Sequence, residues 1–538
     1  MIPSKSETNK SKKTPGKNRA AEIANTFEWL ITAFILAFVF RAFVMEAFRI
    51  PTGSMADTLK GAHFRMRCEQ CGYKYEHAFR PENEGLLPDT IPAYKIKPPQ
   101  TRCPSCGYYL PPSTTMPAPI ANGDRILVLK CIYQFFEPKQ WDVIVFKNPT
   151  EPHINYIKRL IGRPLEKVEI IDGDVYINDQ ISRKPPKVQN ELWMPVYDND
   201  YQPIAPGEDS FNGHKWAQPF NLAGTKWITD RKSPTLLYLD SVADETNTIV
   251  YDSSIGNTPN ATYAYGEVGG YNMLPYCSDL MVRFYVRPEG DSAGLIGAAL
   301  SKYESNYRAW VDLRGKMVIT KVVEGKETEL AEKSIEAPIV GKSTLFKFAN
   351  VDHQLTLEFG GEELTYDMGR GSDAAGPIKP KIEPRLEIFG SGKLTLRHIA
   401  IFRDIHYTLT NSIPNFDRGR AAEGEPFPLK KDEFFVLGDN SPNSEDGRLW
   451  REQGKANKGL KPYRAGVVPR DYLVGKALFV YWPSGFGFPW PQSLKTFLLR
   501  KSENNRLFRV MHTIVSLRWI PNIGQVRFIY GGTEKIKS

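Results

Sequence analysis

A long apolar segment near the N-terminus constrains what this chain can fold into more than any other feature. From Trp29 to Phe40 the only polar residue is Thr32, and after Arg41 the apolar run continues to Met45. Counted from Phe27 to Phe48, the segment has the length of one membrane crossing, which takes about 20 residues. The chain is therefore expected to meet a membrane near its N-terminus and to fold into its domains only after that segment.

The residues around this segment predict its orientation. The preceding stretch Lys10–Arg19 is basic, and basic residues tend to stay on the cytoplasmic side of a membrane. Arg41 would lie near the opposite interface, where its long stem can reach polar surroundings. The alternative is a cleavable signal peptide, but no small-x-small cleavage site follows the apolar core. We therefore expect an uncleaved anchor, with everything after Phe48 on the outer side.

Composition points to several β-rich domains. A length of 538 residues suggests two to four domains. Frequent Gly and Pro alternate with short runs of Val, Ile, Thr, Tyr and Phe, which is typical of strands and turns. The net charge of +9 is small for this length, and basic and aromatic residues are not interleaved as in nucleic-acid binders, so no nucleic-acid partner is expected.

Two residues form a candidate reacting pair. Ser54 lies in the turn "FRIPTGSMADTL" directly after the apolar segment, and a serine in such a turn is ordinarily just a solvated turn residue. Lys158 lies in "INYIKRLIG", among apolar residues of a predicted strand. It is either a strand-edge lysine with its ammonium in solvent or a desolvated amine with a lowered pKa, able to accept a serine proton.

The sequence around these residues resembles bacterial type I signal peptidases, the S26-like peptidases with a Ser-Lys dyad. The resemblance covers roughly half of the chain and rests on ordered segments behind the apolar run. These are "RAFVMEAFRIPTGSMADTL", "GDRILVLK" (Gly123–Lys130), "WDVIVFKNP" (Trp141–Pro149), "YIKRLIG" (Tyr156–Gly162), the hairpin "KVEIIDGDVYIND" (Lys167–Asp179), "FFVLGDNSPNSEDGRLW" (Phe434–Trp450) and "GVVPRDYLVGKALFVYWP" (Gly466–Pro483).

The resemblance implies a role for several residues. Ser54 would be the nucleophile and Lys158 its general base. The Ser54 backbone N–H and the Thr52 hydroxyl would form the oxyanion hole. Ser444 would hydrogen-bond to Lys158 and orient it. Asp446 and Arg448 would pair and brace the loop beneath the site.

At some positions this sequence departs from the pattern of the family it resembles. Thr52 stands where the family has serine or glycine, Ser441 and Pro442 stand in place of Arg-Asp, and Gly447 replaces a serine. None of these changes removes a reacting group. Shallow apolar pockets would receive the small side chains that precede the cleavage site. We expect residues close to Ser54 to line them, namely Ile50, Pro51, Met55 and Leu59.

Four cysteines predict a structural metal site. "CEQCG" and "CPSCG" each place two thiols within reach of one ion, and the glycine permits a tight turn. Together they supply a Cys₄ zinc site from Cys68, Cys71, Cys103 and Cys106, with no ligand position left for catalysis. Two disulfides are the alternative, because this segment is expected on the oxidising side. No cofactor is expected for catalysis, and Cys131 and Cys277 are expected to be buried thiols.

A second insertion, from about Pro206 to about Thr410, predicts an antiparallel β-sandwich. Short strands recur there between turn residues, with no helical period. The stretch Phe348–Leu364 weakly resembles concanavalin-like and laminin-G-like sandwiches, which leaves a carbohydrate or protein ligand open. Asp352 and His353 are read as a turn rather than as a metal pair. Because no catalytic segment lies inside this insertion, its removal is expected to leave cleavage largely intact.

These readings combine into a mainly β architecture with an N-terminal transmembrane helix. The catalytic core would be of signal-peptidase type and interrupted by the zinc ribbon and the sandwich. The C-terminal tail, basic and apolar together, is expected to be interfacial, with a partly buried basic hairpin as the alternative. The expected segments are 1–26 basic tail, 27–48 anchor, 49–62 nucleophile segment, 63–118 zinc-ribbon-like insertion, 119–205 lysine segment, 206–410 sandwich, 411–490 last core part and 491–538 basic amphipathic tail.

The expected function follows from the resemblance. It implies a membrane-anchored serine endopeptidase that removes signal peptides from exported preproteins through an acyl-enzyme. It would sit in the bacterial cytoplasmic membrane as a single-pass protein, with its N-terminus cytoplasmic and its catalytic domain on the periplasmic face. The partners would be preproteins and the bilayer. The alternatives are a tethered binding protein with an inactive core that works through its sandwich, and a Ser-Lys self-cleaving peptidase.

Overall fold

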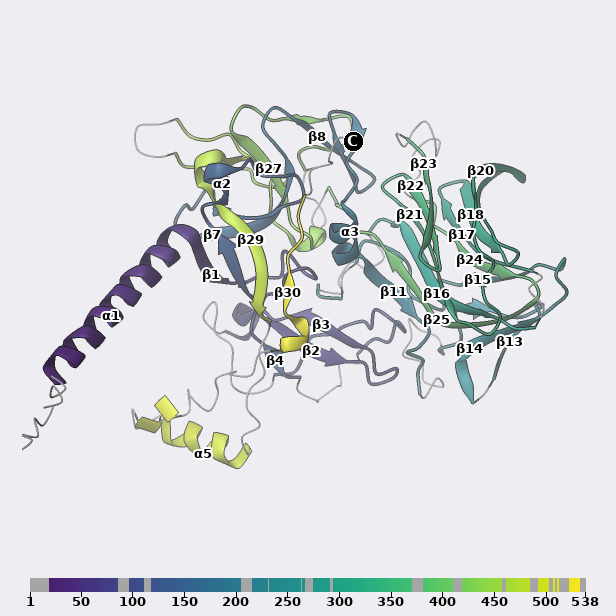
Figure 1. Ribbon diagram of the computed structural model, residues 1–538, viewed down its shortest axis with the longest axis horizontal. Helices are drawn as coiled ribbons and strands as arrows, with labels where there is room; N and C mark the ends of the chain where they lie inside the picture. The colour runs from purple at the N-terminus through teal and green to yellow at the C-terminus, as the bar shows by residue number, and fades with distance from the viewer. Residues whose placement is uncertain are drawn as a thin grey trace, which may run out of the picture.

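The structure is a computed structural model, and its β-rich body carries one long helix at the N-terminus (Figure 1). This confirms the expected mainly β fold with an N-terminal apolar helix. The residues it describes are 19–85, 96–110, 118–204, 215–230, 232–262, 264–266, 274–290, 294–369, 381–409, 419–456, 461–483, 492–502, 507–508, 510–511 and 522–532.

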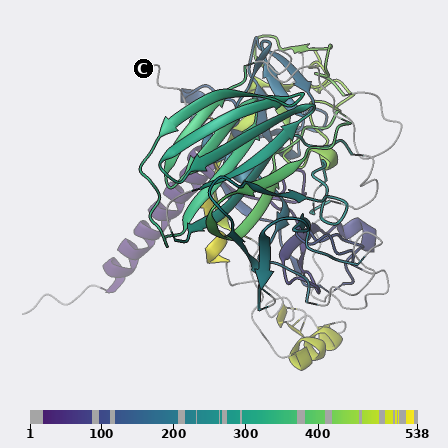
Figure 2. The same ribbon diagram turned by 90° about the vertical axis from the view of Figure 1, so that its right-hand side faces the viewer.

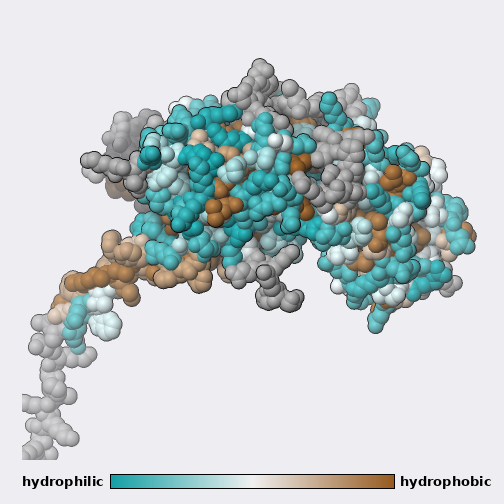
Figure 3. Space-filling model, turned by 90° about the horizontal axis from the view of Figure 1, so that it is seen from above, coloured by the Kyte–Doolittle hydropathy of each residue, from teal (hydrophilic) through white to brown (hydrophobic). Residues whose placement is uncertain are grey.

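The N-terminal helix projects from the body with its apolar side chains exposed. Helix α1 (Arg19–Val39) continues through a short π-helical turn, η1 (Phe40–Val44), into strand β1 (Met45–Arg49). The span Glu22–Val44 is long and apolar enough to cross a membrane, and none of it is buried against the protein. Figure 3 shows this helix as an apolar rod leaving a mostly hydrophilic body. A membrane anchor and a signal sequence both have this length and composition.

The first large sheet holds the segments that resemble a signal peptidase. It has eight antiparallel strands in the order β1-β5-β29-β6-β7-β27-β28, with β30 paired to β29. Its strands after β1 are β5 (Arg125–Leu129), β6 (Val143–Lys147), β7 (Asn155–Gly162), β27 (Glu433–Leu437), β28 (Val468–Pro469), β29 (Leu473–Trp482) and β30 (Arg527–Phe528). Strands β7 and β27 pair with each other, although the sandwich insertion separates them in the sequence. The chain therefore leaves the large sheet, forms the sandwich and returns to the same sheet.

A smaller four-stranded sheet packs beside it. Its order is β10-β9-β8-β26, from β8 (Lys167–Ile171), β9 (Asp174–Ile177), β10 (Gln180–Ile181) and β26 (Phe427–Pro428). The β8–β9 turn at Asp172 and Gly173 has positive φ at both residues, as a tight two-residue hairpin requires. Val168, Ile170 and Val175 bury their side chains in a core shared with the large sheet.

The cysteine-bearing insertion forms a small three-stranded sheet. Its order is β3-β2-β4, from β2 (His63–Arg67), β3 (Lys74–Ala78) and β4 (Ile120–Ala121). The short 3₁₀ helix η2 (Pro81–Glu84) lies between β3 and β4 in the sequence. The four paired cysteines lie in or against the apolar core of this unit, with Phe64 and Tyr75 among its buried side chains.

The second insertion is a β-sandwich, as the sequence predicts, and Figure 2 shows its stacked strands facing the viewer. One sheet runs β13-β14-β25-β16-β21-β22-β23, with β11 also paired to β25; the other runs β12-β15-β24-β17-β18-β19-β20. The first contains β11 (Met194–Asp198), β13 (Trp227–Asp230), β14 (Ser233–Asp240), β16 (Leu280–Pro288), β21 (Thr344–Val351), β22 (Gln354–Phe359), β23 (Glu362–Asp367) and β25 (Lys393–Arg403). The second contains β12 (Phe220–Asn221), β15 (Asn247–Tyr251), β17 (Leu295–Lys302), β18 (Ser305–Asp312), β19 (Lys316–Val323), β20 (Lys326–Ser334) and β24 (Leu386–Gly390).

Alternating side chains explain the sandwich. Strand β18 buries every second residue, among them Tyr307, Ala309 and Val311, as a strand with one face on a core does. From the opposite sheet, Phe284 and Phe346 stack with ring centroids 4.7 Å apart. The inner faces of both sheets therefore form one continuous apolar core.

The remaining described elements are short, except for one helix near the C-terminus. They are α2 (Ile132–Phe135), α3 (Pro186–Leu192), α5 (Gln492–Ser502), η4 (Ser441–Asn443), η5 (Arg470–Tyr472) and η6 (Ile523–Gln525). The end of the tail returns to the large sheet, where β30 pairs with β29 and Ile529 is buried. Most of the remaining tail lies outside the described residues, so its expected membrane contact stays a prediction.

Candidate active site

The turn that carries Ser54 directly follows β1. Ile50 is fixed at its start by a backbone hydrogen bond to Asp124, at 2.8 Å. Within the turn, the Ala56 N–H donates to the Gly53 carbonyl at 3.0 Å and the Leu59 N–H donates to the Met55 carbonyl at 2.7 Å. We call residues 50–59 the nucleophile turn.

The structure brings Ser54 and Lys158 together, although they are far apart in the sequence. Lys158 lies in β7, opposite Ile144 of β6. Its Nζ atom is hydrogen-bonded to Ser54 Oγ at 2.5 Å. Lys158 is 4% exposed, so its amine meets the serine hydroxyl in nearly dry surroundings. This geometry suits transfer of the hydroxyl proton to the amine.

The electrostatic setting favours a neutral amine at this position. Burial lowers the pKa of Lys158 to about 8, because the charged ammonium loses its hydration. The Asp446 carboxylate opposes this effect and the Arg448 guanidinium adds to it. Among the described residues, no carboxylate lies within ion-pair distance of Lys158. The lysine therefore releases its proton far more readily than a solvated one.

The loop after β27 is held by a buried ion pair. Arg448 donates from Nε to Asp446 Oδ1 at 2.8 Å and from Nη2 to Oδ2 at 2.7 Å, and both side chains are almost completely buried. Burial alone would raise the pKa of Asp446, but the Arg448 guanidinium lowers it below its usual value. Asp446 Oδ2 also accepts the Gly438 N–H at 3.0 Å. The pair thus fixes both ends of the loop, as the resemblance implies.

Two unusual residues of this loop have a structural explanation. Ser441 Oγ accepts hydrogen bonds from Arg448 Nη1 at 2.6 Å and from the Thr408 N–H at 2.9 Å. Ser441 therefore ties the loop to the segment that leaves the sandwich. A side chain at Gly447 would meet the Gly466 carbonyl and the Phe435 ring, both at 2.9 Å. The serine expected there from the resemblance would not fit.

The same loop contacts the nucleophile turn through residues that the sequence reading did not assign. Asn440 donates from its backbone to the Ser54 carbonyl at 3.0 Å and from Nδ2 to the Gly53 carbonyl at 3.1 Å. Asp439 accepts a bidentate pair of bonds from Arg159, at 2.8 and 2.7 Å, and a bond from Thr58 at 2.6 Å. Asp439 and Asn440 lie in the "GDNS" stretch, and Arg159 directly follows Lys158. These positions are the sequence signal that could have identified the three residues.

Two supporting residues differ in how they relate to the contacts expected of them. Ser444 Oγ is buried beside Gly438 but has no hydrogen-bond partner in the part of the chain that the structure describes, so the expected bond to Lys158 is not formed. Thr52 is exposed, and its expected place in the oxyanion hole stays a prediction. Ser444 does not orient Lys158 in this structure.

The residues expected to line substrate pockets behave differently from one another. Ile50, Met55 and Leu59 are buried in the core under the large sheet, where they pack with Val128. Pro51 alone is exposed. An apolar residue next to a turn can serve the protein core as well as a pocket, and the local sequence does not distinguish the two. The expected pocket is therefore not formed by the three buried side chains.

The four paired cysteines converge on one point. Cys68 and Cys106 have their sulfurs 3.6 Å apart, as do Cys71 and Cys103, and all four sulfurs lie within 4.8 Å of one another. Each pair is followed by a glycine with positive φ, Gly72 at +76° or Gly107 at +80°. All cysteines of the chain are free thiols, including Cys277, which is buried, and Cys131, which is only half-buried.

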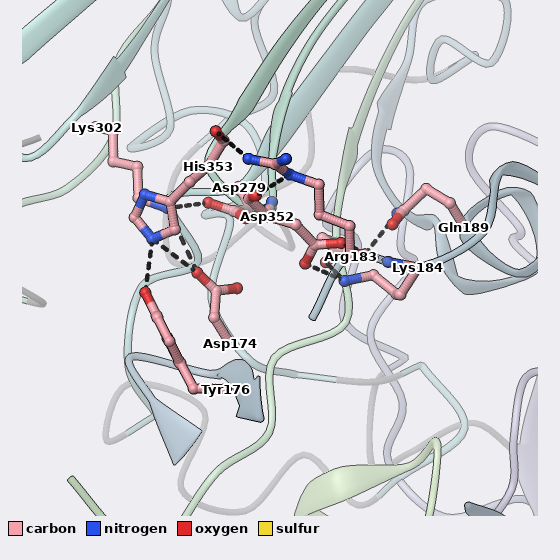
Figure 4. Close-up of polar contacts among 10 residues, drawn as sticks. Asp174, Tyr176, Arg183, Lys184, Gln189, Asp279, Lys302, Asp352 and His353 are labelled. Carbon is pink, nitrogen blue, oxygen red and sulfur yellow. Dashed lines mark hydrogen bonds and ion pairs between the residues drawn. The ribbon is translucent and has the colours of Figure 1, made fainter. Parts of the chain in front are cut away.

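A buried charged cluster joins the small sheet to the sandwich (Figure 4). Asp174, Asp279 and Asp352 bring carboxylate oxygens within 4.8 Å of one another. Lysines already neutralise them: Lys302 Nζ lies 2.5 Å from Asp279 Oδ1, and Lys184 Nζ pairs with Asp352. We call this set of residues the junction cluster. Ammonium groups occupy the place that a cation would take, so it is read as an ion-pair network.

Asp352 and His353 form the expected turn within this cluster. Both have positive φ, +47° and +54°, and together they link β21 to β22. The His353 ring bonds to the Tyr176 hydroxyl at 3.2 Å and lies 3.4 Å from Asp174. The turn thus docks the sandwich onto the small sheet.

Comparison with known proteins finds a family similarity in two parts of the chain. A family model described as signal peptidase, peptidase S26, matches residues 102–208 and 383–482. Lys158, Asp446 and Arg448 lie inside the matched segments, and Ser54 lies before the first of them. Most of the sandwich falls between the two segments.

Similar curated proteins are signal peptidases. Signal peptidase I of Rickettsia canadensis (strain McKiel) is 28% identical over 155 residues, which is 28% of this chain and 43% of that protein. The probable signal peptidase I-2 of a Synechocystis species is 25% identical over 224 residues, covering 39% of this chain and 72% of that protein. The chain thus spans less than half the length of the Rickettsia relative.

Two solved structures are similar to part of this chain. A carbohydrate binding module, CBM66 from Bacillus subtilis, aligns at a TM-score of 0.23 and 9% identity, over 34% of this chain and 95% of that one. Sheep galectin-11 in complex with glycerol aligns at 0.19 and 11%, over 24% and 93%. At these scores the likeness assigns no ligand to the sandwich. The two matched segments, which lie on either side of most of the sandwich, make this chain similar to the peptidase S26 signal peptidases.

Proposed function

We propose that this protein is a membrane-anchored serine endopeptidase that removes signal peptides from exported preproteins. The observation that carries the proposal is the 2.5 Å hydrogen bond between Ser54 Oγ and the buried Lys158 amine. A solvated serine and a surface lysine would have no reason to meet in this way. The similarity to S26 signal peptidases supports signal peptides as the substrate class.

The proposed chemistry has two halves that share one base. Neutral Lys158 takes the hydroxyl proton as Ser54 Oγ attacks the carbonyl carbon of the scissile bond. The Ser54 N–H, with the Thr52 hydroxyl after rotation, stabilises the oxyanion. The Lys158 ammonium returns its proton to the leaving amine, and an ester to Ser54 remains. Lys158 then removes a proton from the water that attacks the ester. It returns this proton to Ser54 Oγ as the ester bond breaks, which releases the signal peptide and restores the free serine and the neutral amine.

The anchor gives this chemistry its location. Helix α1 and the η1 turn end at Val44, only a few residues before the nucleophile turn. We place the N-terminus in the bacterial cytoplasm and the catalytic domain on the periplasmic face, because the basic stretch before α1 favours that orientation. A signal peptide in the same bilayer would then meet Ser54 at a raised effective concentration.

We also propose that the four paired cysteines hold one structural zinc ion. A tetrahedral site with zinc–sulfur distances of about 2.3 Å separates its sulfurs by roughly 3.8 Å, close to the 3.6 Å of the two measured pairs. All four ligand positions are filled by thiolates, so the ion would supply folding energy and no catalytic water.

The zinc proposal is tested by elemental analysis of protein purified without added metal. We expect about one zinc per chain, lost in Cys103→Ser but retained in Cys131→Ser, the matched control outside the site. Metal-free protein with four oxidised cysteines would refute the proposal.

The peptidase proposal is tested by precursor cleavage with the full chain in detergent. Wild type should release the mature protein and Ser54→Ala should not. If folded wild-type protein leaves the precursor intact, the peptidase assignment is wrong. The sandwich would then be the working part of a tethered binding protein.

A further inference from the structure

The second insertion sends one side chain directly into the active site. Tyr265 lies in the described segment 264–266, far in sequence from every signal-peptidase-like segment, and is completely buried. Its ring packs against Gly53, the residue before the nucleophile. A Cβ atom added at Gly53 would lie 2.1 Å from Tyr265 Cε1 and 2.8 Å from Cδ1. The ring therefore occupies the space that a side chain at this position would need.

The ring is held in place from its other side by the cysteine-bearing unit. Tyr265 donates its hydroxyl proton to the Ala62 carbonyl at 3.1 Å and accepts the Ala78 N–H on its own carbonyl at 3.0 Å. His77 Nδ1 lies 3.0 Å from the Ala264 carbonyl. Main-chain and side-chain bonds thus fix the tyrosine to the start of β2 and to the end of β3, so its ring has little freedom to move away from Gly53.

The sandwich is connected to the same segment. Arg403, at the end of β25, donates a hydrogen bond to the Thr262 carbonyl. The segment that carries Tyr265 is therefore tied to the sandwich on one side and to the cysteine-bearing unit on the other. A displacement of either unit would reach the nucleophile turn through this tyrosine.

The nucleophile turn is consequently held between two supports. Asn440 binds the carbonyls of Gly53 and Ser54 from the loop after β27, and the Tyr265 ring presses on Gly53 from the insertion. We propose that Tyr265 is a positioning residue for the Ser54 nucleophile, supplied by the insertion rather than by the signal-peptidase-like core. This inference rests on the proposed peptidase function.

A double-mutant experiment tests the contact itself. Gly53 has no positive φ, so its φ does not oppose alanine, and the three atoms nearest to an added Cβ all belong to the Tyr265 ring. We expect Gly53→Ala to reduce kcat at least about a hundredfold, because a 1 Å misplacement near the chemistry has that scale of effect. Tyr265→Ala alone should reduce kcat about tenfold. In the double variant, the space left by the ring should restore activity about tenfold relative to Gly53→Ala.

Two controls separate positioning from general stability. Tyr265→Phe keeps the ring and should retain most activity, whereas Tyr307→Ala makes a similar cavity in the sandwich core, away from Gly53, and should leave kcat unchanged. Purely additive losses in Gly53→Ala/Tyr265→Ala, or an equal loss in Tyr307→Ala, would overturn the inference.

Amide hydrogen exchange distinguishes this inference from the peptidase proposal. In Tyr265→Ala, the amides of Ala56 and Leu59, bonded within the turn, should exchange at least about tenfold faster than in wild type, and Tyr307→Ala should not change them. Unchanged exchange in an active enzyme refutes the positioning role alone. An inactive wild type with faster exchange in Tyr265→Ala refutes the peptidase proposal and leaves Tyr265 as a packing residue only.

Discussion

Among the described residues, buried lysines occur at two places, and they differ in proton affinity. Lys158, beside Ser54, is 4% exposed, and Lys302, in the junction cluster, is 1% exposed. Burial lowers the pKa of Lys158 to about 8. Burial would lower the pKa of Lys302 as well, but Asp279 and Asp174 raise it well above its ordinary value. The carboxylates of Asp352 and Asp404 raise the pKa of Lys184 in the same way.

The comparison shows that burial alone does not make a base. What separates the two sites is the distance to a carboxylate. Lys302 Nζ lies 2.5 Å from Asp279 Oδ1, whereas Asp446 acts on Lys158 only from beyond ion-pair distance and is itself held by Arg448. The junction lysines therefore stay charged and stabilise an interface, and Lys158 can give up its proton. Four predictions test this contrast, from the largest expected effect to the smallest.

The largest effect is expected at Lys158 itself. Lys158→Ala should lower precursor cleavage by about a thousandfold or more, as fully as Ser54→Ala, because groups that act as a unit lose their contribution together. Lys158→Arg should fail equally, since a guanidinium does not deprotonate in proteins. The double Ser54→Ala/Lys158→Ala variant should be no worse than either single variant. Substantial cleavage by Lys158→Arg would assign the base to another residue.

Removing a junction lysine should instead cost stability. In Lys302→Met, Asp174 and Asp279 remain buried without their cation, and breaking a buried ion pair costs about 3–5 kcal/mol. The loss should appear as a lower denaturant midpoint, with cleavage per folded molecule retained. A Lys302→Met variant that also carries Asp279→Asn should recover part of the lost stability. A loss below about 1 kcal/mol would show that solvent reaches the cluster.

The pH dependence of cleavage should follow the Lys158 amine. The reactive form is neutral, so the rate should rise as pH increases through about 8 and fall below it. The Asp446 carboxylate raises the pKa of Lys158, so Asp446→Asn should shift this acid limb to lower pH. Glu445→Gln should shift it in the same direction by less. A limb that does not move in Asp446→Asn would contradict this electrostatic coupling.

The smallest effect is expected from Asp404, which shares Lys184 with Asp352. Burial raises the pKa of Asp404 to about 7, above its unfolded value near 4. The folded protein then binds an extra proton between these values, so this group's stabilisation is present at low pH and is lost as pH rises towards 7. Melting temperature should therefore fall over this range, less steeply in Asp404→Asn. An identical slope in that variant would locate the titration elsewhere.

The contrast also changes the expected outcome of deleting the sandwich. From the sequence, removal of Pro206 to Thr410 was expected to leave cleavage largely intact. That deletion would remove Tyr265 from behind Gly53, Thr408 from Arg448 and Lys302 from Asp174. The structure therefore gives reason to expect loss of activity, and the experiment remains to be done.

Much of this protein could be predicted from local patterns. The apolar run predicts the N-terminal helix because a span of that length needs no partner to be recognised. Short strands that recur between turn residues predict the sandwich, and paired C-x-x-C-G sequences predict one cluster of four cysteines. The segment around Lys158 also lies within the part of the chain that is similar to S26 signal peptidases.

Other features depend on contacts between distant segments, and only the tertiary structure decided them. Ile50, Met55 and Leu59 read equally well as pocket or core until the large sheet closes over them. Ser444 was expected to bond Lys158, yet its hydroxyl has no partner within the described chain. Tyr265 gave no signal, because its contact with Gly53 crosses more than two hundred residues.

The sequence by itself determined which residues are candidates for the chemistry, and the tertiary structure decided the surroundings of each one. Lys158 lies in the middle of an apolar strand and Lys302 at the end of another. The sequence of neither strand determines the pKa of its lysine. Proton affinity depends on the charges and hydration within a few ångströms of an atom. Those neighbours come from other strands and loops, so the difference between a base and a buried ion pair arises only when the chain has folded.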